Sequence, residues 1–418
     1  MSMIGFENFS ENLIISIKSR LKPVCSSYRF YAIFPGLVLC TTSIWSQKEP
    51  VADPVLPQTI VFEKKQIATE SYESVGVFDV NNDGALDIVS GAFWYEGPLF
   101  AKRHSVGGPK RFGEYYDHFS TIPFDVNSDG KTDFITGGWF EKKLVWKENN
   151  GSEEWPEHLI AEVGNIESTR AWDMNGDGVL EIVPNTPNDA LRIVFWQNGK
   201  FEVKIIAEKQ GHGLGYGDLN GDGRGDIVVP HGWLEAPEDI FNEEWVLHEE
   251  FQLGTTSVPM LVTDVNGDGL NDLIVGQGHG YGLHWYEQSM GNKKKGSREW
   301  SKHPIDPFNS QYHTMEMADL DGDGVEELVT GKRYKAHNGN DPGGYDPIGL
   351  YYFRWNGESF SKQVIDFGVY GEGKGTGVSF EVIDLNEDGR PDIVVPGKDG
   401  LSVYFNKELN NELKEQKH

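Results

Sequence analysis

The sequence predicts an all-β fold, a seven-bladed β-propeller with a calcium-type loop between the first and second strands of each blade. Three observations lead to this prediction: an acidic nine-residue loop that recurs, β-rich runs around every copy, and unmatched strands at the two ends of the repeat region. The first copy, DVNNDGALD, has oxygen-bearing side chains at positions 1, 3, 5 and 9 and Gly84 at position 6. Alternating oxygen ligands, folded back at a glycine, suit a hard cation such as calcium.

Seven copies of this loop occur, and their starts are separated by 46, 48, 45, 46, 55 and 65 residues. A period of about this size is the sequence mark of a repeat architecture. The predicted calcium ligands are the side chains at positions 1, 3, 5 and 9 of each copy. They are Asp79, Asn81, Asp83, Asp87, Asp125, Asn127, Asp129, Asp133, Asp173, Asn175, Asp177, Glu181, Asp218, Asn220, Asp222, Asp226, Asp264, Asn266, Asp268, Asp272, Asp319, Asp321, Asp323, Glu327, Asp384, Asn386, Asp388 and Asp392.

Strand-like runs flank each loop, as in SVGVF before the first copy and DIVSGAFW after it. A third run recurs as LVWKEN and LHWYEQ, and a fourth as WPEHLIAE and FEVKIIAE. Four short antiparallel strands in about 45 residues are typical of a propeller blade. The last repeat has no fourth run, whereas residues 59–68 form a strand with no blade before it. We therefore expect the N-terminal strand to complete the last blade and close the ring, in an antiparallel fold with almost no helix.

The repeats set the predicted domain boundaries. The propeller is expected at 59–408 and a charged tail at 409–418, with a linker at 47–58. Residues 1–46 are interpreted as a signal peptide and N-terminal extension, because an apolar run at 31–45 follows basic residues and precedes Ser46. A lipoprotein site at Cys40 is the less favoured alternative. We thus expect a secreted or periplasmic monomer with no membrane span in its mature chain.

The net charge of −28 argues against nucleic acid as a partner, since phosphates need a basic surface. Candidate binding residues are expected at the end of the ring opposite the calcium-type loops, here called the mouth. Residues that open the innermost strands should line it: Glu73, His118, Glu167, His212, Ser257 and His313. Loops after the second strands should add Trp94, Trp139, His231, Trp233, His279, Lys332, Tyr334, His337 and Lys398.

Histidine, glutamate and tryptophan together suit a carbohydrate, because indole faces stack on sugar rings while His and Glu handle hydroxyls and protons. The histidines could equally hold a transition metal. By contrast, a W-x-x-H pattern on the fourth strand indicates blade packing, with His104 in a related position and His284 on a third strand. The histidines of this pattern are His158, His248 and His303.

With seven such loops, residues 59–405 resemble the FG-GAP or VCBS repeat family, a propeller type also found in integrin α subunits. The resemblance implies that the calcium ions are structural. Residues 312–342, YHTMEMADLDGDGVEELVTGKRYKAHNGNDP, are similar to the propeller domain of aldos-2-ulose dehydratase, as is LVWKENNG at 144–151. That enzyme eliminates water from keto sugars such as 1,5-anhydrofructose. It continues into a cupin-like domain and many of its loops are degenerate, so an activity that needs the second domain is not implied.

The second resemblance implies a carbon–oxygen lyase that eliminates water or alcohol from a keto sugar. His212 or His313 would be the base, Lys332 or a His-bound metal would stabilise the enolate, and Tyr334 or His337 would be the acid. Substrate-binding residues would be His118, Glu167, His231, Trp233, His279, Trp94 and Trp139. The alternative is a propeller that binds a glycan or a protein without catalysis. The histidines at the mouth favour an enzyme by a small margin.

Overall fold

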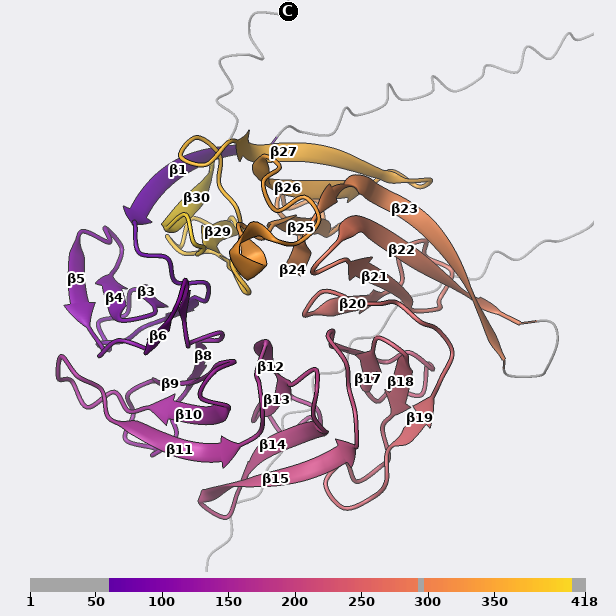
Figure 1. The fold of residues 1–418 in the computed structure, drawn as a ribbon, viewed down its shortest axis with the longest axis horizontal. Coiled ribbons are helices and arrows are strands. Elements are labelled where there is room, and N and C mark those ends of the chain that lie inside the picture. The colour runs from indigo at the N-terminus through magenta and orange to yellow at the C-terminus, as the bar shows by residue number, and fades with distance from the viewer. Residues whose placement is uncertain (1–59, 292–296, 408–418) are drawn as a thin grey trace, which may run out of the picture. The chain divides into compact units, whose positions relative to one another are not determined.

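The computed structural model describes residues 60–291 and 297–407. The predicted signal peptide and linker, and the C-terminal tail at 409–418, lie outside the described residues. Contacts group Pro57–His418 into one compact unit. Its described part is all-β apart from one 3₁₀ helix, η1 (Ala336–Gly339), and its sheets stand around a ring as in a β-propeller (Figure 1).

The first half of the ring contains three four-stranded antiparallel sheets, each built from consecutive strands. The first is β2 (Gly76–Phe78), β3 (Asp87–Ser90), β4 (Phe93–Glu96) and β5 (Lys102–Ser105). The second is β8 (Ile122–Phe124), β9 (Asp133–Gly137), β10 (Lys143–Lys147) and β11 (Glu157–Glu162). The third is β12 (Ser168–Trp172), β13 (Glu181–Asn185), β14 (Leu191–Gln197) and β15 (Lys200–Ala207).

An eight-stranded sheet follows, in the order β19-β18-β17-β16-β20-β21-β22-β23. Its first half is β16 (Gly215–Gly217), β17 (Asp226–Val229), β18 (Gly232–Glu235) and β19 (Val246–His248). Its second half is β20 (Met260–Thr263), β21 (Asp272–Gly276), β22 (Tyr281–Met290) and β23 (Arg298–Ser310). The next sheet is β24 (Tyr312–Ala318), β25 (Glu327–Lys332), β26 (Ile348–Trp355) and β27 (Phe360–Gly368).

The last sheet has the order β1-β30-β29-β28, with strands β28 (Glu381–Ile383), β29 (Asp392–Val395), β30 (Leu401–Lys407) and β1 (Val61–Ala68). The N-terminal strand pairs antiparallel with the C-terminal one, with Val61 opposite Lys407. This confirms the expectation that β1 completes the sheet of the last repeat. The outer strands β5, β11, β15, β23 and β27 follow the rim of the ring, and β12 and β24 lie nearer its centre (Figure 1).

One feature corrects the expectation of a purely antiparallel fold. The innermost strands β16 and β20 pair in parallel, with Gly215 opposite Met260, and this joins two four-stranded units into the eight-stranded sheet. Gly215 permits the approach, because a Cβ there would lie 2.6 Å from the Met260 carbonyl oxygen. A small hairpin of β6 (Arg111–Phe112) and β7 (Tyr115–Tyr116) also stands between the first two sheets.

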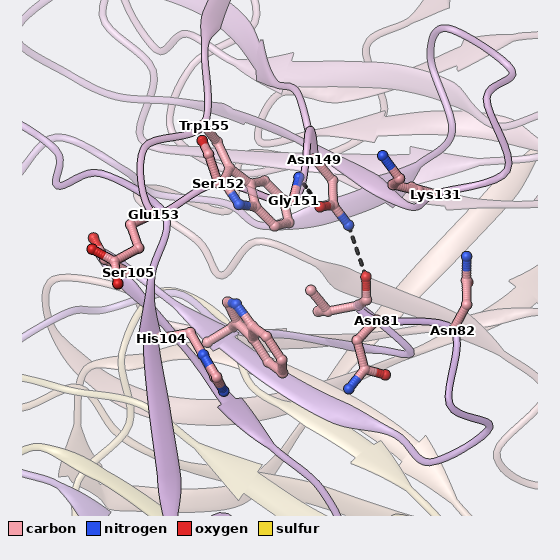
Figure 2. A pocket seen from close by; sticks show the side chains of 12 residues that line it. Asn81, Asn82, His104, Ser105, Lys131, Asn149, Gly151, Ser152, Glu153 and Trp155 are labelled. Carbon is pink, nitrogen blue, oxygen red and sulfur yellow. Dashed lines mark hydrogen bonds between the residues drawn. The ribbon is translucent and has the colours of Figure 1, made fainter.

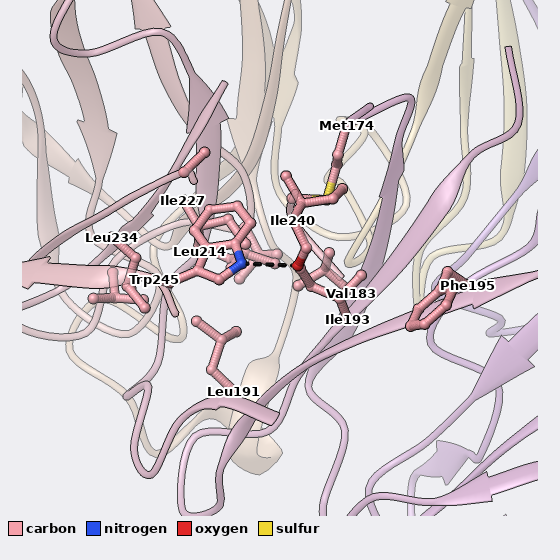
Figure 3. Packing of buried hydrophobic residues seen from close by; sticks show 13 residues of the cluster. Met174, Val183, Leu191, Ile193, Phe195, Leu214, Ile227, Leu234, Ile240 and Trp245 are labelled. Carbon is pink, nitrogen blue, oxygen red and sulfur yellow. Dashed lines mark hydrogen bonds between the residues drawn. The ribbon is translucent and has the colours of Figure 1, made fainter. Parts of the chain in front are cut away.

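The core lies between neighbouring sheets, where side chains from adjacent repeats interdigitate. Figure 3 shows one such cluster, which contains Val183 and Ile193 of one sheet together with Leu214, directly before β16, and Ile227 of β17 in the next. The indole N–H of Trp245 donates to the Ile240 carbonyl oxygen at 3.1 Å, so the aromatic ring is buried with its polar group satisfied. Because each sheet packs on both neighbours, the ring holds the loops at its two ends in fixed relative positions.

Candidate functional site

Four side chains from three sheets converge at one end of the ring: Glu167 directly before β12, His212 before β16, His279 after β21, and His313 on β24. One ligand atom from each lies within 4.8 Å of the others. Their exposed fractions range from 0% for His313 to 10% for His212 and His279. We call these four residues the His₃Glu cluster.

Hydrogen bonds show which ring nitrogen carries the proton in two of the histidines. His212 Nδ1 lies 2.9 Å from the Thr256 carbonyl oxygen, and His279 Nδ1 lies 2.8 Å from Asp341 Oδ2. Since both partners only accept, both Nδ1 atoms carry the proton. The two Nε2 atoms are 2.8 Å apart. Two neutral rings would therefore direct lone pairs at each other.

A cation between the two rings would remove this repulsion. Burial first, and then the neighbouring His212, lower the pKa of His279 to about 4, which opposes a proton there at neutral pH. A metal ion satisfies both nitrogens, because ligands at 2.0–2.1 Å from a shared ion lie about 3 Å apart. A carboxylate or carbonyl on the remote ring nitrogen is also the usual support for a metal-bound histidine. The donor set thus fits a transition metal.

Glu167 is the acidic member of the cluster. Its Oε1 lies 3.1 Å from His313 Nε2 and 2.8 Å from Arg333 Nη1, while Arg333 Nε donates to Glu73 Oε1 at 3.0 Å. Burial would raise the pKa of Glu167, but the neighbouring His212 and His313 and the Arg333 guanidinium hold that pKa well below the usual range. Glu167 is therefore a carboxylate, as a metal ligand must be.

Asp341 connects the cluster to a fourth histidine. While Oδ2 accepts from His279, Oδ1 lies 2.9 Å from His337 Nδ1. The His337 ring stacks on that of His279 with centroids 4.4 Å apart, and its side chain is 54% exposed. Its backbone N–H donates to the Tyr115 hydroxyl at 2.6 Å. With Nδ1 on Asp341, His337 has Nε2 available for a bound molecule.

A cavity of about 250 Å³ opens beside the cluster. Its walls are aromatic, and its polar groups are Glu167, Arg333 and His337. The aromatic lining residues are Tyr115, Phe119, Trp139 and Phe140. Apolar walls with a few convergent polar groups are usual for a small-molecule site.

The structure thus brings Glu167, His212, His279, His313 and His337 together, with Trp139 in the cavity wall. Sequence reasoning missed Arg333, Asp341 and Tyr115, which belong to the long sixth repeat and to the β6–β7 hairpin. It also missed Gly278, which lies between two of the rings. A Cβ there would come within 3.2 Å of His212 Cε1 and 3.3 Å of His313 Cδ2.

Trp94 and Trp233 were expected at the mouth, but they lie on the third strands β4 and β18. Each stacks on a histidine of the fourth strand, with centroids 4.1 Å apart for Trp94–His104 and 4.2 Å for Trp233–His248. Trp94 lines a pocket of about 300 Å³ together with Asn81 of the first calcium-type loop. Figure 2 shows this pocket, with Asn81 and His104 labelled.

The same stack recurs twice more, in the second sheet and in the second half of the eight-stranded sheet, which confirms the packing role predicted for these histidines. His158 stacks on Trp146 and His303 on Trp285. Each of the four histidines also contacts a glutamate two residues after the tryptophan, at 2.8–3.0 Å. These glutamates are Glu96, Glu148, Glu235 and Glu287. His284 lies on the third strand β22, as expected.

Lys332 does not face the cavity. It is 1% exposed, and its Nζ donates to Ser310 Oγ, Gln311 Oε1 and the Gly343 carbonyl oxygen at 2.6–2.8 Å. All three of its protons are thereby used to anchor the segment that carries Asp341. The cation beside the cluster is its neighbour Arg333.

The structure also leaves three other predicted residues outside the cluster. Tyr334 stacks on Tyr370, with centroids 5.1 Å apart, in a separate pocket. His118 is 7% exposed and packs against Phe134, and this burial lowers its pKa to about 3. His231 lies in the turn between β17 and β18.

Each acidic loop joins the first and second strands of its sheet, as predicted. In the first loop, Asp79 accepts from the backbone N–H groups of Asp83 and Gly84 at 3.1 and 2.8 Å. The buried Asp87 accepts from Val80 and Gly97, and its pKa is raised by burial and by Asp83 and Asp79. Clustered carboxylate and amide oxygens fit a calcium ion by their chemistry.

The sixth loop differs, because an arginine of β26 enters it. The Arg354 guanidinium contacts Asp321 through Nη2 and Glu327 through Nε, the latter at 3.0 Å. Its positive charge neutralises part of the acidic donor set of this loop.

Comparison with known proteins supports the repeat architecture. The FG-GAP-like repeat family matches residues 109–183 and 264–330. These two segments are similar to FG-GAP-like repeats. No curated protein sequence matches it significantly.

Solved structures show the fold alone. A chain of the crystal structure of BBS1N in complex with ARL6DN, soaked with lead, has a TM-score of 0.51 at 11% identity, covering 84% of this chain and 97% of that one. The mercury-soaked crystal gives a TM-score of 0.49 with the same identity and coverage. Within residues 60–291 and 297–407, no helix is long and apolar enough to cross a membrane.

Proposed function

We propose that this protein is an exported, calcium-stabilised propeller of seven blades that holds a transition metal at its mouth. The eight-stranded sheet counts as two blades in this description. The metal would be held by the His₃Glu cluster, and the site would act as a carbon–oxygen lyase on a keto sugar. The observation that carries the proposal is the 2.8 Å approach of His212 Nε2 to His279 Nε2, each on a ring whose Nδ1 carries the proton.

The proposed reaction is an elimination from a ketone with a neighbouring C–H and a β-hydroxyl or β-alkoxy group. A base removes the proton from carbon, the carbonyl takes up the developing negative charge, and the C–O bond then breaks as an acid protonates the leaving oxygen. A bound metal supplies Lewis-acid stabilisation of the carbonyl oxygen. Arg333 also lines the cavity, but Glu73 and Glu167 balance its charge, so the metal would be the main electrophile beside the carbonyl.

His337 is the residue we assign to proton transfer. Asp341 holds its Nδ1, so Nε2 is oriented by the same carboxylate that orients His279. Tyr115, in the same cavity, keeps its hydroxyl proton because burial raises its pKa to about 12. It can therefore donate a hydrogen bond to the leaving oxygen or to a substrate hydroxyl.

This assignment changes the roles expected from sequence. His313 is fully buried and His212 nearly so, and both belong to the metal-ligand set, so neither is the base. The metal would take the enolate-stabilising role expected of Lys332. Support for a carbohydrate is the aromatic wall with Trp139, on which the apolar face of a sugar can stack, together with the resemblance of residues 312–342 to a keto-sugar dehydratase.

The test is a screen of 1,5-anhydrofructose and other keto sugars with purified, metal-loaded protein. Elimination forms a conjugated enone, which is followed by ultraviolet absorbance. We expect turnover that falls at least 100-fold in His337→Ala. His303→Ala is the matched control, because His303 belongs to a Trp–His stack on the rim. No product with any keto sugar would contradict the lyase.

A non-catalytic binding module is the second candidate. The propeller-like solved structure at TM-score 0.51 comes from a complex of BBS1N with ARL6DN, so the fold occurs in a protein–protein assembly. A metal-loaded protein that binds a glycan or a protein at the mouth, without turnover, would favour this candidate.

A further inference from the structure

A second pocket lies next to the cavity of the His₃Glu cluster, and we propose that it is an anionic subsite that binds a carboxylate or sulfate group of the carbohydrate. The proposal rests on the function proposed above and adds the substrate class, an acidic sugar. We call this pocket the cationic pocket. It has a volume of about 270 Å³, and its lining is Ser71, Arg111, Glu114, Tyr334, Lys335, Tyr370 and Lys398.

The pocket is positively charged, whereas the chain as a whole is acidic. The chain carries a net charge of −28, yet Arg111, Lys335 and Lys398 line this pocket beside one carboxylate, Glu114. Glu114 Oε1 lies 3.4 Å from Lys335 Nζ and its Oε2 lies 3.9 Å from Lys398 Nζ. One carboxylate leaves two of the three positive charges unbalanced within the pocket.

Lys398 is the enclosed cation, with 9% of its surface exposed. Its Nζ donates to the Lys335 carbonyl oxygen at 2.9 Å and lies 3.8 Å from the centre of the Tyr115 ring. An ammonium has three protons, so these contacts leave capacity for an anionic acceptor. Partial desolvation makes such a charge-assisted bond stronger than one on an open surface.

Tyr115 joins the two pockets. Its ring lies beneath Lys398, its hydroxyl accepts from the His337 backbone, and its side chain also lines the cavity of the His₃Glu cluster. A molecule in that cavity therefore has the cationic pocket on the other side of one aromatic ring. This arrangement lets one sugar residue occupy the metal site while a charged substituent, or an acidic neighbouring sugar, occupies the cationic pocket.

The remaining walls suit a sugar that carries the charge. Tyr334 and Tyr370 stack nearly parallel, with an interplanar angle of 7°, and Tyr370 is 64% exposed. The exposed aromatic face can pack against a ring, while Ser71 and the tyrosine hydroxyls can bond its hydroxyls. The pocket thus combines what an acidic carbohydrate needs: two unbalanced positive charges and an aromatic platform.

The experiment compares three probes that differ only at carbon 6: methyl glucoside, methyl glucuronide and methyl glucoside 6-sulfate. Their dissociation constants are measured by calorimetry with wild-type protein and with an Arg111→Met/Lys335→Asn variant. Asn is chosen at 335 because Lys335 has φ of 54°, which Asn tolerates. Lys200→Met, at an exposed lysine paired with Glu202, is the control.

We expect at least one of the two charged probes to bind wild-type protein tenfold or more tightly than the neutral probe. This preference should fall below threefold in the double variant, persist in Lys200→Met, and weaken at high salt. The charged probe that shows it identifies the group as carboxylate or sulfate. Equal binding of all three probes, no binding of any, or an unchanged preference in the double variant would overturn the proposal.

Measuring the metal content distinguishes failure of the subsite from failure of the proposed metal centre. Arg111 and Lys335 are not ligands of the His₃Glu cluster, so the double variant should retain the metal of wild-type protein. A charge preference in protein that holds no transition metal would leave the subsite standing and refute the metal centre. A metal-loaded protein without that preference would refute the subsite alone.

Discussion

Replacement of Asp341 by Asn isolates the part of the site that orients the proposed metal ligands. Asp341 uses one oxygen for His279 Nδ1 at 2.8 Å and the other for His337 Nδ1 at 2.9 Å. An asparagine has one acceptor oxygen and presents an N–H₂ group on the other side. At least one histidine therefore loses its partner, and both lose the carboxylate charge.

The expected loss follows from the role of such partners. Removing the carboxylate behind a metal-bound histidine typically costs 10–100-fold in metal affinity. This corresponds to about 1.4–2.7 kcal/mol. Burial and His212 already lower the pKa of His279. The His279 ring is therefore expected to stay neutral at neutral pH in the variant as well.

The assay is competition between the protein and a chromogenic chelator for zinc or manganese, for wild-type and Asp341→Asn proteins. Asp346→Asn is the matched control, since Asp346 lies in the same segment and accepts from the Tyr281 hydroxyl at 2.7 Å. We expect the affinity to fall in the first variant and not in the second. Equal affinity in wild-type and Asp341→Asn proteins, with folding intact, would refute the reasoning.

Three further predictions follow from the geometry. Gly278→Ala puts a Cβ 2.9 Å from the Thr256 carbonyl oxygen and within 3.3 Å of two cluster rings, so metal stoichiometry should fall while the circular dichroism spectrum stays unchanged; full stoichiometry would contradict this. Arg333→Met leaves Glu73 and Glu167 buried without their cation and should lower the free energy of unfolding in urea by about 3–5 kcal/mol, with part regained in Glu73→Gln/Arg333→Met; a loss below about 1 kcal/mol would argue against a stabilising Arg333. Removing calcium should lower the melting temperature by several degrees, because the acidic loops then repel internally; an unchanged melting temperature would count against calcium in the loops.

Much of the fold could be predicted from local patterns that recur along the sequence. The nine-residue loop marks the turn between first and second strands, and its recurrence locates every sheet. The pairing of β1 with β30 was also predictable, because the last repeat has no fourth run after β30 and the N-terminal strand has no blade before it. The parallel pairing of β16 with β20 was not, since it depends on how closely Gly215 lets two sheets approach.

The site was predictable where a residue's register decides its place. Counting back from the loops located Glu167, His212 and His313 at the same end of the ring. The assignment of Trp94 to the loop after the second strand failed, because the turn after β3 is tight and places the indole on the next strand, against His104. Lys332 and Arg333 show the other limit. They are adjacent, but the fold of the long sixth repeat decides their partners. Lys332 donates to hydroxyl and carbonyl groups, whereas Arg333 reaches Glu167.

The most direct test of the account is the metal content of the purified protein after mild calcium chelation and dialysis, measured by elemental mass spectrometry. We predict close to one zinc, manganese or other transition-metal ion per chain in wild-type protein and in His303→Ala, and its loss in His279→Ala. Calcium as the only metal, with no difference between these proteins, would contradict the proposed His₃Glu metal centre.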